Sequence, residues 1–166
     1  MEFNWYIFLI AALIPMITGF IWYSPKLFGN AWMQACGLTE EQLKGANMSK
    51  VFLLSYVLSI LLALSLYSLT VHQSHLASIF LGTEGFGDPT SEVGMLHASI
   101  MEKYGNNFRT FKHGAFHGFL AGIFIVLPIL GTNAMFERKS WKYVWINTGY
   151  WAITIMLMGG VVCQWA

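Results

Sequence analysis

The sequence predicts an all-α, polytopic membrane protein that forms a single domain over residues 1–166, with four transmembrane helices. Of its residues, 56% are hydrophobic and 10% are charged, whereas ordinary soluble domains have roughly 45–50% and 25%. Four uncharged runs of 20 to 24 residues predict spans at about 4–23, 51–71, 114–136 and 143–166. Each run can cross a bilayer, because a transmembrane helix needs about 20 residues. A soluble bundle is not expected, since the chain lacks an amphipathic shell that would bury four apolar helices.

The first predicted span ends in a motif of aromatic residues, proline and glycine. A cleaved secretion signal is not expected. Such a signal begins with positively charged residues, whereas the second residue here is the acidic Glu2. Pro25 lacks a backbone N–H and disfavours a helical residue before it, so it ends the helix at the water boundary. The aromatic side chains suit the membrane interface. The residues of this interfacial motif are Trp22, Tyr23, Ser24, Pro25, Phe28 and Gly29.

Two shorter helices are expected outside the spans. An interfacial helix at about 26–36 has apolar residues at helical spacing, and Gly37 can end it. The following Thr39 to Gln42 is typical of a capping box. In the long loop, an amphipathic helix is expected at about 89–104, with Asp88 as its N-cap and Pro89 at its first position.

The distribution of basic residues predicts the orientation of the four spans. The connections 24–50 and 137–142 lie on one side and carry six of the nine Lys and Arg residues. The loop 72–112 and both termini lie on the other side. Because cytoplasmic connections are rich in Lys and Arg, both termini are expected outside the cytoplasm. The lipid bilayer is the expected partner, and no basic stripe indicates nucleic-acid binding.

Small residues predict a close contact between helices. Gly114, Gly118 and Gly122 of the third span are four residues apart, which is a doubled G-x-x-x-G pattern. In lipid, small residues let helix backbones approach and gain dispersion contacts. Ser55 and Ser59 of the second span have the same spacing and are the expected facing surface. Packing within one bundle is the preferred interpretation, and a homodimer seam is the alternative.

Four histidines are candidate metal ligands: His72, His75, His113 and His117. The first two close the second span and the last two open the third, so both pairs are expected at one membrane level. Spacings of three and four place two rings on one helix face. Four imidazoles suit Zn, Cu or Ni, or axial ligation of haem, with Glu84, Asp88 and Glu92 as orienting carboxylates. The alternative is that the rings only hydrogen-bond to loop carbonyls, with no cofactor bound.

Several motifs resemble one known family. The first half contains WYSPKLFGNAW at 22–32 and GLTEE at 37–41, and the second half contains NAMFER at 133–138 and INTGY at 146–150. Together they resemble the small bacterial membrane proteins known as domain of unknown function 1761. The resemblance implies a four-helix fold in a bacterial inner membrane and implies no reaction. The long loop and the pair His113 and His117 depart from typical, shorter members.

Three classes of function follow from these observations. Motifs for a serine nucleophile elbow, a phosphate-binding loop, a dinucleotide fold or a zinc protease are absent from the sequence, so an enzyme is not the expected class. The preferred hypothesis is a non-catalytic accessory or interaction subunit that binds other membrane subunits or itself. The alternatives are a metal- or haem-binding redox or sensor protein and a small carrier for an uncharged solute.

Overall fold

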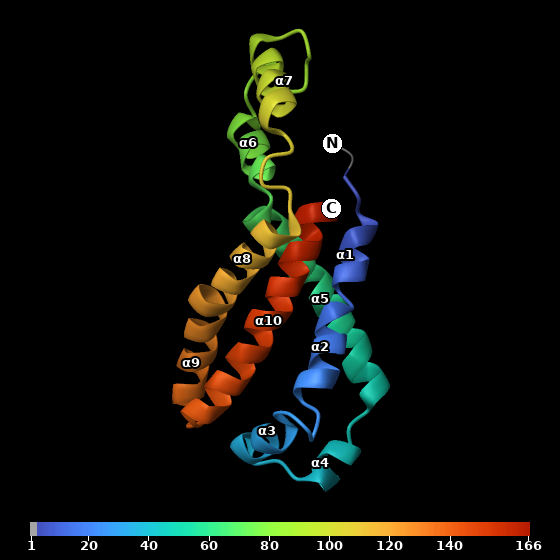
Figure 1. Cartoon of the computed structure of the whole chain (residues 1–166), viewed down its shortest axis with the longest axis vertical. Helices are drawn as coiled ribbons and strands as arrows, with labels where there is room; N and C mark the ends of the chain where they lie inside the picture. The colour runs from blue at the N-terminus through green and yellow to red at the C-terminus, as the bar shows by residue number, and fades with distance from the viewer. Residues whose placement is uncertain (1–2) are drawn as a thin grey trace.

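The computed structural model describes residues 3–166, and in this part of the chain it has ten α-helices, one π-helical turn and no β-strand (Figure 1). In chain order the elements are α1 (Tyr6–Ala11), α2 (Ile14–Trp22), α3 (Gly29–Cys36), α4 (Glu40–Lys44), α5 (Met48–Thr70), α6 (His72–Phe80), α7 (Glu92–Tyr104), α8 (Phe111–Ala121), the π-turn η1 (Gly122–Val126), α9 (Leu127–Phe136) and α10 (Trp141–Trp165). The predicted all-α class is therefore confirmed for these residues.

Three helical segments are long and apolar enough to cross a membrane: α5, the continuous segment Phe111–Phe136, and α10. The fourth predicted span is a shorter apolar segment, Tyr6–Trp22, which consists of α1 and α2. Pro15 lies at the break between them, because it cannot donate a hydrogen bond to the carbonyl four residues earlier. At 1.5 Å per residue this segment is about 26 Å long, against ~30 Å for a hydrocarbon core. The described chain thus has three clear candidate spans rather than four.

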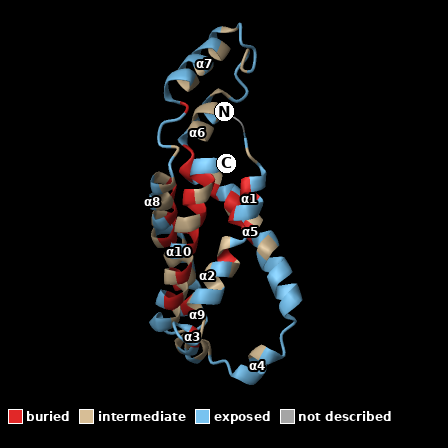
Figure 2. Ribbon diagram, turned by 45° about the vertical axis from the view of Figure 1, so that its right-hand side comes forward, coloured by how far each residue is buried: buried red, intermediate tan, exposed pale blue. Residues whose placement is uncertain are grey.

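Helix α10 is the centre of the bundle. It contacts α1, α2, α3, α5, α8 and α9. In the apolar 18-residue stretch of α10, 61% is buried, against 17% in the corresponding stretch of each of the other two candidate spans. Figure 2 shows the buried residues concentrated along α10 and on the surfaces that face it. The main core cluster joins Leu66 of α5 to Ile155, Met158 and Val162 of α10.

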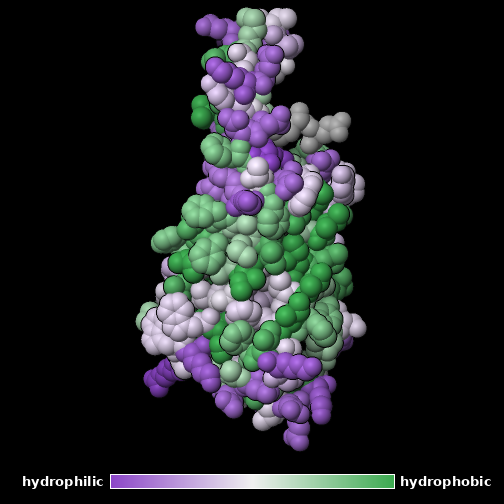
Figure 3. Space-filling model, in the orientation of Figure 1, coloured by the Kyte–Doolittle hydropathy of each residue, from purple (hydrophilic) through white to green (hydrophobic). Residues whose placement is uncertain are grey.

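The two ends of the bundle carry different parts of the chain. Helices α6 and α7 project beyond the end at which α1 begins and α10 finishes, whereas α3, α4 and the turn between α9 and α10 lie at the other end (Figure 1). The visible face in Figure 3 has a band of hydrophobic side chains around its middle and hydrophilic side chains at both ends. Contiguous apolar surfaces of this extent are typical of sites that contact a membrane or another protein.

The short helices start later than the sequence predicts. Helix α3 begins at Gly29 rather than near residue 26, and it ends at Gly37, whose φ of 73° is left-handed. The capping box of Thr39 and Gln42 is present at the start of α4. Helix α7 begins at Glu92 rather than at residue 89, because the hydroxyl of Ser91 accepts the free N–H of Gly94. Asp88 is therefore not the cap of this helix.

Helix α6 has no counterpart among the predicted elements. Val71 has an extended conformation (φ −105°, ψ 96°) that ends α5, and the chain becomes helical again at His72. The third long segment also starts earlier than predicted. Thr110 caps it by accepting the N–H of His113. His113, one residue before the predicted start of the span, therefore lies inside α8 together with His117.

Candidate metal centre

The glycines of the third long segment pack against α10. A Cβ atom at Gly114 would meet the backbone of Gly159, and one at Gly118 would lie 2.8 Å from the carbonyl carbon of Ile155. A Cβ at Gly122 would lie 2.8 Å from the Cβ of Ala152. Real Cβ atoms do not approach this closely, so glycine is required for the contact at all three positions. The close backbone contact predicted from the spacing is present and holds α8 in register with α10.

The helix that faces these glycines differs from the predicted one. The prediction of Ser55 and Ser59 as the facing surface is wrong, because the atoms nearest to the glycine face belong to α10. Ser55 is exposed, and the hydroxyl of the buried Ser59 donates to the carbonyl of Ser55 within α5. Small residues on α10, such as Gly159 and Ala152, allow the backbones of the two helices to come close at the glycine face.

The interfacial motif forms a compact turn between α2 and α3. The rings of Trp22 and Phe28 stack with their centroids 4.4 Å apart, and the Trp22 indole donates to the carbonyl of Ile146 (3.1 Å). The hydroxyl of Tyr23 donates to Asn147 Oδ1 (2.8 Å). Gly29 lies against the backbone of Tyr23 and Ser24, where a Cβ atom would clash. The motif thus ties the end of α2 to the first turns of α10.

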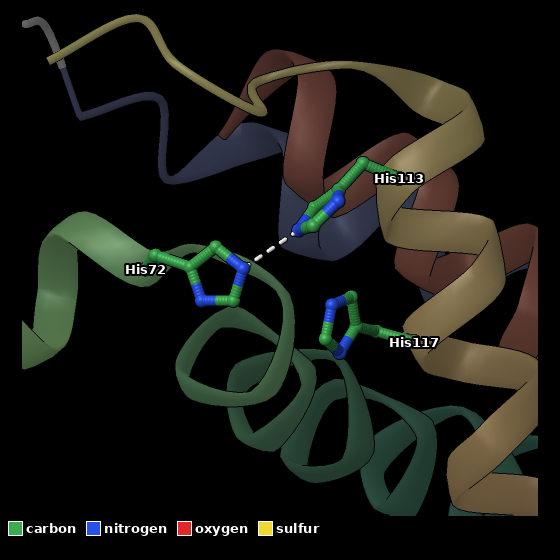
Figure 4. Close-up of side chains that lie close together, drawn as sticks. All are labelled: His72, His113 and His117. Atoms are coloured by element: carbon green, nitrogen blue, oxygen red, sulfur yellow. Dashed lines mark hydrogen bonds between the residues drawn. The ribbon is translucent and has the colours of Figure 1, made fainter. Parts of the chain in front are cut away.

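Three histidines from distant parts of the sequence meet at the other end of the bundle (Figure 4). His72 is the first residue of α6, immediately after the break at Val71. His113 and His117 are four residues apart on α8, which places their rings on one face of that helix. Figure 4 shows the three rings pointing toward one another from the two elements. The fold therefore produces the juxtaposition that sequence spacing alone left open.

The nitrogen atoms of these rings are close enough to share one ion. Each residue offers one ligand atom, and the three atoms lie within 4.8 Å of one another. The two Nε2 atoms of His72 and His113 are 2.8 Å apart and hydrogen-bonded. A tetrahedral Zn²⁺ with Zn–N bonds of 2.0–2.1 Å holds its ligand nitrogens ~3.3 Å apart. Small rotations of the rings would therefore give a three-histidine site with a fourth position open.

The fourth predicted ligand, His75, lies outside this cluster. The group that can hold an ion in the described chain contains His72, His113 and His117 and does not include His75. The side chain of His75 is exposed, and its carbonyl accepts the hydroxyl of Ser78. His72 and His75 both follow the break at Val71 and lie on α6. The ring of His72 lies beside those of His113 and His117, so a spacing of three on α6 does not bring both rings to α8.

The predicted orienting carboxylates also lie elsewhere. The hydroxyl of Thr90 donates to Asp88 Oδ1 (2.7 Å), as does its backbone N–H (2.8 Å), and these bonds hold the pKa of Asp88 below its ordinary value. Among the hydrogen bonds of residues 3–166, none joins Glu84, Asp88 or Glu92 to a histidine ring. The three rings instead contact one another and an aromatic side chain.

That aromatic side chain is Phe108, which sequence reasoning did not select. Its ring centroid lies 5.0 Å from that of His113 and 5.9 Å from that of His72. Its φ of 62° is left-handed, which is uncommon for residues other than glycine and is found most often at functional sites. The carbonyl of Phe108 accepts the thiol of Cys163 (3.4 Å), so α10 fixes its position. No sequence motif marks an aromatic residue that packs in this way.

The geometry favours a single ion over haem. Haem with two axial histidines needs the imidazoles on opposite faces of a flat macrocycle. Here two of the rings are hydrogen-bonded directly to each other, and all three surround one point. Neutral imidazoles are ligands for Zn, Cu, Fe and Ni. A divalent first-row transition metal is therefore the group that this set of donors fits.

The comparisons with known proteins place the chain in a family without an assigned activity. The model of a family described as "Protein of unknown function (DUF1761)" matches residues 6–163, which is nearly the whole chain. The match confirms the resemblance drawn from the motifs at 22–32 and 133–150. No curated protein and no solved structure matches the chain.

Proposed function

We propose that this chain, which belongs to the DUF1761 family, is an integral membrane protein that binds a divalent transition-metal ion, with Zn²⁺ the best fit. The observation that carries the proposal is the convergence of His72, His113 and His117, whose ligand atoms lie within 4.8 Å of one another. Three histidines with a fourth position open are the ligand set of a zinc site that can bind a further molecule. The interpretations as an accessory subunit and as a solute carrier stay predictions.

The membrane part of the proposal is a bundle of four spans in a bacterial inner membrane. Three long apolar helices and the band of hydrophobic surface support it (Figure 3). The segment Tyr6–Trp22 serves as the fourth span, since small local thinning of the bilayer accommodates a slightly short helix. Helix α3 lies in one interface, and the exposed helix α7 extends from the opposite one.

The proposed site lies at the boundary between the apolar band and the polar end. His72 follows the end of α5, and His113 and His117 lie in the first two turns of α8. A bound ion would connect these two segments in addition to the packing of α5 on α8. The aromatic ring of Phe108 restricts the rotation of His113 and His72, a role that hydrogen-bonded partners have at other metal sites.

Protein purified without a chelator and without a nickel affinity step is expected to contain about one metal ion per chain. The double variant His113→Ala/His117→Ala is expected to lose it, because one remaining imidazole binds a metal weakly. His75→Ala is the control, because it removes an imidazole that is exposed on α6 and lies outside the cluster. Elemental analysis gives the metal content. Far less than one ion per chain, or equal loss in the His75→Ala control, would contradict the proposal.

The orientation follows from the basic residues of the connections. Six of the nine Lys and Arg residues lie in 24–50 and 137–142, at the end of the bundle with α3 and α4. We expect this end to be cytoplasmic, which places both termini and the histidines outside the cytoplasm. A reporter that is active only in the cytoplasm should be silent at the C-terminus and active when inserted after Gly45. Activity of the C-terminal fusion would reverse the orientation.

A further inference from the structure

A cavity of about 340 Å³ lies beside the histidine cluster. Helices α6 and α7 and the turn that follows α7 form its walls. The lining side chains are mainly apolar and include Leu76, Ile100, Met101 and Tyr104. Its volume falls within the range of small-molecule sites, which is about 300–1,000 Å³.

Two residues connect the cavity to the metal cluster. His72 lines the cavity and supplies one of the three ligand atoms. Phe108 also lines the cavity, and its ring packs on His113. A molecule in the cavity would therefore contact the ring of one ligand, His72, and the aromatic ring that packs on a second, His113.

Hydrogen bonds fix the spacing between the walls of the cavity. The side-chain amide of Gln73 donates to the carbonyls of Tyr104 (3.3 Å) and Asn107 (2.8 Å). These bonds join the start of α6 to the end of α7, and both Gln73 and Asn107 line the space. Because the bonds fix the distance between the two helices, the space is part of the folded structure.

The position of the cavity also restricts what it can take. Its lining residues belong to α6, to α7 and to the turn that follows α7. These helices project from one end of the bundle (Figure 1), and that end of the visible face is hydrophilic above the apolar band (Figure 3). Molecules with an apolar body and a polar head concentrate at this depth of a membrane. The apolar lining suits such a body, and the open position of a three-histidine ion suits a head group with an oxygen or sulfur donor.

We propose that the cavity binds a small amphiphile, whose donor head group takes the open coordination position and whose apolar tail lies between α6 and α7. This inference rests on the proposed metal site and adds the chemical class of its ligand. Binding of the head alone needs only the ion, whereas binding of the tail needs the cavity. The two contributions can therefore be measured separately.

The test uses full-length protein in lipid nanodiscs, loaded with Co²⁺, whose visible absorption reports directly on the ligands of the ion. Two probes have the same hydroxamate head: acetohydroxamate and hexanohydroxamate, which has four more methylene groups. Burial of four methylene groups is expected to make the longer probe bind roughly 200-fold more tightly. The shift of the cobalt spectrum gives both affinities.

Two variants fill the cavity, Ile100→Trp and Leu76→Phe, and each should reduce the preference for the longer probe to a few-fold. Both should keep the binding of Co²⁺ and of acetohydroxamate, which also shows that they are folded. Leu96→Trp is the matched control, because Leu96 is an exposed residue of α7. Partition of the longer probe into lipid raises its apparent affinity equally in all variants, so the comparison with Leu96→Trp removes this contribution.

The outcomes separate the two proposals. Equal affinity for both probes in the parent protein, or an undiminished preference in both filled variants, would overturn the amphiphile site and leave the metal site standing. Failure of the parent protein to bind Co²⁺ would overturn both. A preference that only the cavity-filling variants remove would support the site as proposed.

Discussion

Replacing Gly118 with leucine is expected to separate α8 from α10 and to destabilise the bundle by about 3 kcal/mol or more, the upper part of the range for overpacked sites. The added Cβ alone would lie 2.9 Å from the Cα of Met156 and would also meet the carbonyl of Ile155. These are backbone atoms of the central helix, so no side-chain rotation relieves the contact. Even Gly118→Ala should cost about 1–3 kcal/mol. Unfolding in mixed micelles with increasing SDS measures the change.

Gly131→Ala is the matched control for this prediction. Gly131 is also a buried glycine of the third long segment, but the nearest atoms to its added Cβ are ring atoms of Trp141 at 3.9 Å, an ordinary contact. Alanine has the higher helix propensity, so this variant should be neutral or slightly more stable. If Gly118→Leu unfolded at the same SDS fraction as the parent protein, the face of α8 in contact with α10 would be wrongly assigned.

Zinc is expected to stabilise the protein by about 4 kcal/mol when its free concentration is 1,000 times the dissociation constant, because an ion that binds only the folded state shifts the equilibrium toward it. The expected rise in melting temperature is roughly 10 °C for a chain of this size. A bound ion would connect His72 after α5 with His113 and His117 on α8. Thermal melting in a mild detergent, with and without Zn²⁺, measures the shift.

His72→Ala should remove most of this stabilisation, since it leaves both remaining ligands on one helix. His75→Ala should keep it. The comparison matters because unfolded chains also bind zinc through histidine, and the two variants lose the same number of imidazoles. A similar shift in the parent protein and in His72→Ala would mean that the ion does not connect the two segments.

The long helices were predictable because a run of about 20 residues without a charged side chain is a direct signal of a membrane span. The prediction of 51–71 corresponds to α5 (Met48–Thr70), and that of 143–166 to α10 (Trp141–Trp165). The helices begin two or three residues before the predicted starts, since a helical backbone continues past a charged side chain into the interface. The first segment is the exception. Pro15 divides it into two short helices, and the composition of the run does not reveal this.

The site was predictable only in part. Spacing alone placed His113 and His117 on one helix face, and the fold brings His72 to them. The same reasoning also selected His75, which lies outside the cluster although it is three residues from His72 on α6. Ser55 and Ser59 were selected for their small size, although the smaller Gly159 and Ala152 occupy the contact. Sequence spacing identifies a face, whereas its partner is decided by packing.

The central position of α10 has a consequence for biosynthesis. This helix contacts most of the others, yet it follows all of them in the chain. Transmembrane helices can insert one by one and associate afterwards. In the proposed membrane arrangement, the backbone of Gly118 would therefore face lipid during translation until α10 is inserted. The bundle would then assemble only after insertion, because α10, the helix that contacts most of the others, is synthesised last.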